Sequence, residues 1–248
     1  MKRILAWITT IPFLLSFGVV LVIFDLAGRA VRPFSLRAFE YVMAALQRTL
    51  TALFLICGTR VHIERPDTIR PRTGYAIISN HQSLFDIAII GGMLFTNFPK
   101  YVAKKELGKG IPSISLNLKR GGNALIDRDD RRQAIRAIRD MARTAQNRNV
   151  SVVIFPEGTR SRDGALGEFK RAGSIALLRQ AESLPVVPMA IDGAWKLLRH
   201  NMKPVPFGTT VRVRFGDPVE RFPDDGEAML VHAEKFITAA LEEWRRPG

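Results

Sequence analysis

The sequence has few of the residue types on which disulfide and metal sites depend. Its 248 residues include one cysteine, Cys57, which excludes an internal disulfide framework and a cysteine-rich metal site. Cys57 lies in an apolar run, so we interpret it as a packing residue and not as a nucleophile. The four histidines lack the paired spacing of a zinc site, and we therefore expect no metal.

Acidic residues are also scarce. The chain has 23 Asp and Glu against 37 Lys and Arg, which gives a net charge of +14. So basic a chain needs an anionic partner, which is a nucleic acid, an anionic membrane surface or a phosphorylated substrate. Binding of nucleic acid requires basic residues interleaved with exposed aromatic residues, or a recognition helix. The aromatic residues here concentrate in apolar segments, so we expect no nucleic-acid partner.

The sequence shows no internal repeat, but it does contain long hydrophobic runs. Ile4 to Phe24 is almost unbroken apolar sequence, about long enough to span a bilayer core. Basic residues flank both of its ends, which leaves its orientation open, and no small-residue cleavage site closes it as in a signal peptide. A second run, Tyr41 to Cys57, is interrupted by Gln47 and Arg48 and suits an interfacial helix or one packed on the first. We predict that residues 1–58 form a membrane-associated helical pair, monotopic or single-spanning.

From residue 59 onward, short strand patterns alternate with amphipathic helix patterns. Strands are predicted at residues 61–63, 75–79, 100–103, 123–126, 151–155, 186–191 and 211–215. Helices are predicted at residues 87–94, 131–147, 172–181 and 227–246. This alternation predicts a layered α/β fold for residues 59–248, which we expect to form the second domain.

A histidine and an aspartate lie five residues apart in the segment Asn-His-Gln-Ser-Leu-Phe-Asp, residues 80–86. Residues five apart on one helix point about 140° away from each other, so His81 and Asp86 meet only if His81 precedes the helix. In that arrangement the carboxylate accepts the Nδ1 proton and leaves Nε2 free as a base. We expect Ser83 to cap the helix and backbone N–H groups of its first turn to bind an oxyanion.

A second polar turn, Phe155-Pro156-Glu157-Gly158-Thr159-Arg160, follows a buried strand pattern. Two strand ends that both carry ionisable groups are how an open α/β sheet builds a site. The planar guanidinium of Arg160 suits a phosphate. Lys104 and Arg128 also follow predicted strands, and an open sheet would turn them toward the same edge.

Together, Asn-His-x4-Asp and Phe-Pro-Glu-Gly-Thr-Arg-Ser resemble the glycerolipid acyltransferase family, in particular the 1-acyl-glycerol-3-phosphate acyltransferases. The resemblance covers residues 61–192 and implies a mixed, twisted α/β sheet flanked by helices, as in glycerol-3-phosphate acyltransferase. It implies that His81 is the catalytic base and that Asp86 orients it. It also implies substrate binding by the residues that match the family's other blocks, which are Lys104, Arg128, Glu157, Gly158, Thr159 and Arg160.

The resemblance further implies substrates and a location. The acceptor would be lysophosphatidic acid, the donor acyl-CoA or acyl-carrier protein without another cofactor, and the product phosphatidic acid. The enzyme would lie at the inner or cytoplasmic membrane, in contact with anionic lipids, and its catalytic domain would face the cytoplasm. Two alternatives stay open: another lyso-lipid acceptor, such as lyso-ornithine lipid or a lysophospholipid, and a non-catalytic protein that binds anionic lipid. The segment Ile111-Pro112-Ser113-Ile114 departs from the family pattern and is expected to line the acyl tunnel, which leaves the preferred chain length open.

Overall fold

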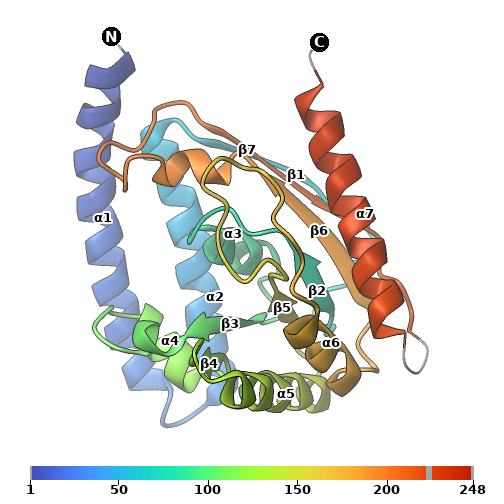
Figure 1. Cartoon of the computed structure of the whole chain (residues 1–248). Helices are drawn as coiled ribbons and strands as arrows, with labels where there is room; N and C mark the ends of the chain where they lie inside the picture. Colours follow the sequence, from blue (N-terminus) through green and yellow to red (C-terminus); the bar gives the residue numbers. More distant parts are fainter. Residues whose placement is uncertain (1, 222–224, 247–248) are drawn as a thin grey trace.

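The computed structural model describes residues 2–221 and 225–246, so residues 1 and 248, the outer ends of the two predicted segments, lie outside the described residues. The described chain forms a mixed sheet with the strand order β1-β7-β6-β2-β5-β3-β4 (Figure 1). Its strands are β1 (Arg60–Glu64), β2 (Ala76–Ser79), β3 (Lys100–Lys104), β4 (Ala124–Ile126), β5 (Val152–Ile154), β6 (Val186–Asp192) and β7 (Thr210–Phe215). Strands β2 to β6 run parallel, while β7 is antiparallel to β6 and parallel to β1.

The helices surround this sheet. They are α1 (Lys2–Val31), α2 (Leu36–Leu53), α3 (Asp86–Met93), α4 (Ile114–Arg120), α5 (Arg131–Arg148), α6 (Arg171–Gln180) and α7 (Gly226–Arg245), with short 3-10 helices η1 (Phe54–Cys57), η2 (Lys105–Gly108) and η3 (Ala194–Leu198). The strands and helices predicted beyond residue 59 are all present, with ends within one residue of the prediction. Helix α4 was not predicted.

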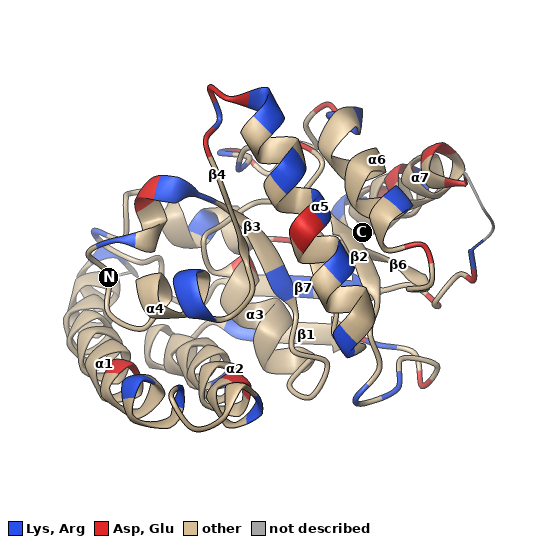
Figure 2. Cartoon of the chain, turned by 90° about the horizontal axis from the view of Figure 1, so that it is seen from below, with Lys and Arg blue, Asp and Glu red and all other residues tan. Residues whose placement is uncertain are grey.

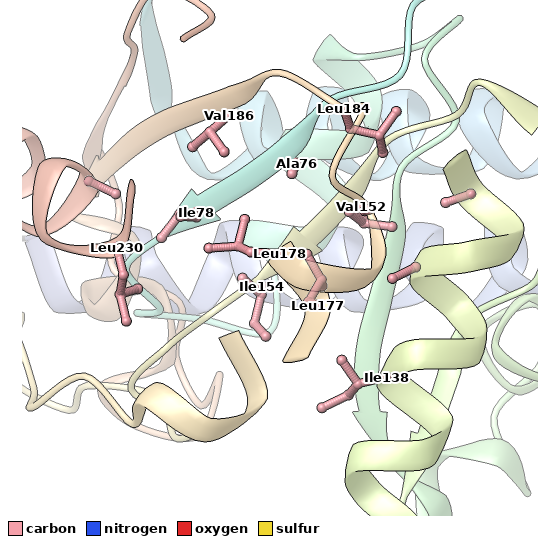
Figure 3. Close-up of a cluster of buried hydrophobic side chains, with 14 of the residues drawn as sticks. Ala76, Ile78, Ile138, Val152, Ile154, Leu177, Leu178, Leu184, Val186 and Leu230 are labelled. Atoms are coloured by element: carbon pink, nitrogen blue, oxygen red, sulfur yellow. The ribbon is translucent and has the colours of Figure 1, made fainter. Parts of the chain in front are cut away.

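The central strands are buried on both faces, as their continuous Val and Ile runs require. Alternate residues point to opposite sides. One set packs under α5, α6 and α7 in the cluster of Figure 3, which includes Ile78, Ile138, Val152, Leu177 and Leu230. The other set, which includes Ile77 of β2 and Val153 of β5, packs against α1, η1 and α3. These helices contribute Phe13, Phe54 and Ile89 to the second cluster. The predicted mixed α/β sheet between two helical layers is confirmed.

The N-terminal helical pair shares this core. Helix α1 continues past the predicted Phe24 to Val31, and α2 begins after Ser35, whose hydroxyl accepts a hydrogen bond from the Ala38 N–H. Phe13 of α1 and Phe54 of η1 are buried in the cluster that also contains β2 and β5 residues. The helical segment ends with η1 at Cys57, and Gly58 follows with a φ of +63°. The boundary at residue 58 thus marks a change of secondary structure and does not separate two independently packed units.

A buried ion cluster attaches α2 to the sheet. The carboxylate of Glu40, 3% exposed, accepts hydrogen bonds from Lys100 Nζ of β3 at 2.6 Å and from Arg148 Nη2 of α5 at 2.8 Å. Two turns further along α2, the side chain of Gln47 is also buried, at 7% exposure. Helix α2 therefore presents polar anchoring groups to the sheet and is part of the folded domain.

Candidate active site

The loop that carries His81 is fixed where it leaves the sheet. Asn80 follows the last residue of β2, and its side-chain amide bonds both backbone groups of Ile191 in the neighbouring β6, each at 2.8 Å. These two bonds continue the β2–β6 pairing by one step through a side chain. His81 therefore starts from a defined point at the carboxyl edge of the sheet, where open α/β sheets bind ligands.

His81 and Asp86 meet as their spacing predicted. His81 lies in the loop, Asp86 is the first residue of α3, and His81 Nδ1 lies 2.8 Å from Asp86 Oδ2. The Asp86 side chain is fully buried, whereas that of His81 is 15% exposed. The imidazole also stacks on the ring of Phe155, with centroids 4.0 Å apart and an interplanar angle of 14°. A carboxylate at Nδ1 selects the tautomer that leaves the Nε2 lone pair free to accept a proton.

One local expectation for this loop is wrong. Ser83 does not cap α3, since Phe85 occupies the N-cap position and the Ser83 hydroxyl accepts from the Phe85 N–H in the preceding turn. The N–H groups of Gln82 and Ser83 do not face a ligand, because both donate to Asp86 Oδ2, at 2.7 and 2.8 Å. The Asp86 carboxylate binds the backbone N–H groups of the turn that precedes it, and nothing in the sequence indicated that it would occupy these donors. These two N–H groups are therefore not free to bind an oxyanion.

Glu157 ties the second predicted turn to the His81 loop. Its Oε1 accepts from the His81 N–H at 2.7 Å and its Oε2 from the Gly167 N–H at 2.8 Å, while Ser161 N–H donates to the His81 carbonyl at 2.8 Å. Burial raises the pKa of Glu157, although the two backbone hydrogen bonds act to lower it. With both oxygens bound to the backbone, Glu157 acts as a positioning residue that joins the loops after β2 and β5.

The predicted substrate-binding cations lie along the same edge. Thr159 and Arg160 are exposed in the turn after β5, beside the His81 loop, and Gly158 turns the chain with a φ of +66°. Lys104 ends β3 and Arg128 follows β4, both exposed. At about 4.8 Å per strand, Lys104 lies roughly 10 Å and Arg128 roughly 14 Å along the edge from β2. Within residues 2–221 and 225–246, no acidic side chain pairs with Lys104, Arg128 or Arg160.

One further cation lies at this turn and was missed. The Lys170 backbone N–H donates to the Pro156 carbonyl at 2.8 Å, and its Nζ lies 3.5 Å from the point where a Cβ on Gly158 would lie. The exposed ammonium thus covers the glycine between Glu157 and Thr159. No motif singles out Lys170, and only the folding of the loop between β5 and α6 brings it to the turn.

The arrangement supplies an oriented base and nearby cations, while neither Ser83 nor Cys57 is an accessible nucleophile. Ser83 is 0% exposed, and Cys57 is buried where its thiol faces the Thr9 carbonyl of α1. In the part of the chain that the structure describes, no group of three or more His, Cys, Asp or Glu side chains could hold a metal ion. Chemically, such a site can deprotonate a hydroxyl of a bound anionic molecule without a covalent intermediate on Ser83 or Cys57.

Comparison with known proteins gives a consistent result. The profile of the family described as "Acyltransferase" matches residues 60–192. A Cocos nucifera protein named 1-acyl-sn-glycerol-3-phosphate acyltransferase is 34% identical over 193 residues, which is 75% of this chain and 58% of the plant protein. The human protein named 1-acyl-sn-glycerol-3-phosphate acyltransferase alpha is 33% identical over 150 residues, 60% of this chain and 52% of its own length. This chain thus spans little more than half of these curated relatives.

The same fold has been solved in a bacterial protein. The crystal structure of the 1-acyl-sn-glycerophosphate (LPA) acyltransferase PlsC from Thermotoga maritima superposes with a TM-score of 0.79 at 22% sequence identity. The match covers 100% of this chain and 99% of that one. It therefore includes the N-terminal helical pair as well as the sheet.

Proposed function

This chain belongs to the acyltransferase family, and from that premise we propose that it transfers an acyl group to the free hydroxyl of 1-acyl-sn-glycerol-3-phosphate. The donor is a thioester of coenzyme A or of acyl-carrier protein, and the product is phosphatidic acid. The observation that carries the proposal is the His81–Asp86 pair, held at 2.8 Å beside the turn that contains Arg160. The names of the plant and human relatives support the acceptor.

In the proposed reaction the substrate's own hydroxyl is the nucleophile. His81 Nε2 accepts the hydroxyl proton while the oxygen attacks the thioester carbonyl, and the buried carboxylate of Asp86 stabilises the imidazolium that forms. The tetrahedral intermediate then expels the thiolate, which takes the proton back from Nε2. The new ester bond replaces the thioester, and the enzyme returns to its starting state.

The acceptor's phosphate requires cations close to the base. Arg160 lies in the turn that Glu157 fixes to His81, and Lys170 covers the same turn, so we assign these two residues to the phosphate. Lys104 and Arg128 lie further along the edge. We propose that they bind the more distant part of the acceptor headgroup or the phosphates of the donor.

The N-terminal pair would hold this site at a bilayer. By length and composition, α1 and α2 are both apolar enough to cross a membrane. Helix α1, however, contacts the rest of the protein near both ends: Thr10 accepts from the Val205 N–H at 2.9 Å, and Asp25 accepts from the Ser113 N–H at 2.7 Å. A spanning helix would separate these contacts across the bilayer. We therefore propose that α1 is monotopic and lies in one leaflet.

The surface around α1 fits this placement. Its outward face is apolar along the whole helix and includes Ile4, Ile8, Ile11, Leu15, Val19, Val22 and Leu26. In Figure 2, ribbon segments coloured blue for Lys and Arg lie where α1 and α2 meet and on α4 and α5. Basic surfaces are attracted to the anionic lipids of the cytoplasmic leaflet, so we propose that the catalytic domain faces the cytoplasm.

An acceptor panel tests the proposed function. The full chain is purified in detergent and incubated with a radiolabelled acyl-CoA or acyl-carrier protein and with lysophosphatidic acid, another lysophospholipid or the phosphate-free lyso-ornithine lipid, and the products are identified. We expect the highest kcat/KM with lysophosphatidic acid. A His81→Ala protein provides the background. Efficient transfer to lyso-ornithine lipid alone, or transfer to no acceptor with either donor, would refute the proposal.

A further inference from the structure

Gln82, the residue between His81 and Ser83, has a side chain that no step of the mechanism uses. It is 1% exposed, and its Nε2 donates to Asp192 Oδ1 at 3.2 Å and, more weakly, to the Gly164 carbonyl at 3.4 Å. Its backbone N–H donates to Asp86 Oδ2. The position of Gln82 is therefore coupled on one side to the catalytic pair and on the other to the ends of β6 and the loop after β5.

The same two acceptors bind an arginine from the far end of the chain. Arg245, the last residue of α7, approaches Asp192 through Nη2 at 2.6 Å and Nε at 3.1 Å, and its Nη2 also donates to the Gly164 carbonyl at 2.7 Å. Burial acts to raise the pKa of Asp192, but the hydrogen bonds from Arg245 and Gln82 outweigh it and leave that pKa lowered. Asp192 is therefore a carboxylate shared by Arg245 and Gln82.

We propose that Arg245 is a positioning residue for acyl transfer, which acts through Asp192 and Gly164 to hold Gln82 and thereby the His81–Asp86 loop in place. Arg245 lies beyond residues 60–192, which the family profile matches, and contacts neither His81 nor Asp86 directly. Without Arg245, the Asp192 carboxylate would face Gln82 with its other oxygen unpaired by a cation and would reorient toward water.

The size of the effect of Arg245→Ala on acyl transfer follows from the contacts that still hold the His81 loop. Asn80 and Glu157 still hold the loop at its entry and at the His81 N–H, so the loop loosens without unfolding. A displacement of the His81 imidazole by a fraction of an ångström slows the chemical step and leaves the binding of the acceptor intact. We expect kcat to fall about 10- to 100-fold in Arg245→Ala with the acceptor KM within about twofold of wild type.

The kinetic test is a double-mutant cycle in the full chain. Arg245→Ala, Gln82→Ala and the double variant are measured beside wild type, and Arg245→Lys tests rescue by a retained charge. The matched control is Arg214→Ala, which removes surface ion pairs of β7 with Glu243 of α7 and Glu64 of β1. We expect Arg245→Ala to have little further effect once Gln82 is alanine, Arg245→Lys to recover part of kcat, and the control to keep kcat within about twofold. Equal losses in both backgrounds, or a wild-type kcat in Arg245→Ala, would overturn the inference.

The kinetic arm rests on the proposed function, so a second arm does not use activity. The rate at which diethyl pyrocarbonate modifies His81 is followed by peptide mass spectrometry, with the other histidines as internal references. We expect faster modification of His81 in Arg245→Ala and an unchanged rate in Arg214→Ala. If wild type transfers no acyl group yet His81 becomes more reactive in Arg245→Ala, the proposed function fails and the positioning role stands. An unchanged His81 rate in Arg245→Ala contradicts the positioning role itself.

Discussion

Replacing Glu40 with alanine removes the carboxylate that attaches α2 to the sheet. In the wild type, Lys100 Nζ lies 2.6 Å and Arg148 Nη2 2.8 Å from the Glu40 oxygens, and the Lys100 side chain is 6% exposed. After the substitution Arg148 can turn toward water, because its side chain is 24% exposed. Lys100 cannot, and it is left as a buried cation without its anion.

Breaking a buried pair by removing one partner costs about 3–5 kcal/mol, and we expect Glu40→Ala to lower the free energy of unfolding by that amount. Burial already lowers the pKa of Lys100, against the Glu40 charge that raises it. Loss of Glu40 therefore lowers this pKa further. When the folded pKa of a lysine lies below its unfolded value of about 10.4, the unfolded state binds more protons between the two, and stability rises with pH there. The deficit of Glu40→Ala should thus shrink as the pH is raised toward 10.

The assay is denaturant unfolding of the detergent-solubilised full chain, followed by near-UV circular dichroism at several pH values. Asp140→Ala is the matched control, since it removes the acidic partner of an exposed pair with Arg143 whose side chains are 57% and 61% exposed. The control should cost at most about 1 kcal/mol. A Glu40→Ala cost as small as that of the control, or a deficit that does not shrink with rising pH, would refute the reasoning that α2 is fixed by a buried charge.

Three other predictions concern single residues. In steady-state kinetics, Arg160→Ala should raise the acceptor KM about 10- to 100-fold and Lys170→Ala about 2- to 5-fold, with kcat little changed, because a charge that meets phosphate contributes to ground-state binding. The control Arg171→Ala, whose side chain pairs with Glu227, should show no such rise in KM. An unchanged KM in Arg160→Ala would show that the phosphate lies elsewhere. Gly158→Ala should destabilise the protein by about 1–2 kcal/mol in thermal unfolding, because its φ of +66° disfavours a Cβ; a stability equal to wild type would mean that the turn relaxes. The lowered pKa of Asp192 contributes stability that is present above the unfolded pKa of about 3.9 and is lost as the pH falls through the lower folded value. Asp192→Asn should therefore remove part of the acid-induced loss of stability. An acid titration of unfolding identical to that of wild type would contradict this prediction.

The parts that the sequence predicted are those set by local geometry. Helical rotation requires that His81 precede the helix if it is to meet Asp86, and the structure has this arrangement. Continuous apolar runs placed β2 and β5 correctly, because strands buried on both faces need continuous apolar residues such as Val and Ile. The adjacency of the two polar turns followed from the expected sheet type.

The parts that were not predicted depend on contacts between distant residues. Glu40 and Lys100 are 60 positions apart, so nothing local indicates that an acid at the start of an apolar run is buried against β3. Glu157 was predicted to bind substrate from its place in the second polar turn, yet both of its carboxylate oxygens accept hydrogen bonds from backbone N–H groups, those of His81 and Gly167. Helix α4 is only seven residues long and follows Ser113, whose φ of +59° no sequence signal announced.

Acyl transfer by the His81→Ala and Asp86→Asn proteins tests the central claim most directly. Both are measured beside wild type with lysophosphatidic acid and a radiolabelled acyl thioester, after circular dichroism has shown that they are folded. We predict that His81→Ala has no detectable transfer, because the base is gone, and that Asp86→Asn loses about 10²–10⁴-fold in kcat, because an amide at 2.8 Å from Nδ1 no longer selects the productive tautomer. Turnover close to wild type in a folded His81→Ala protein would contradict the account.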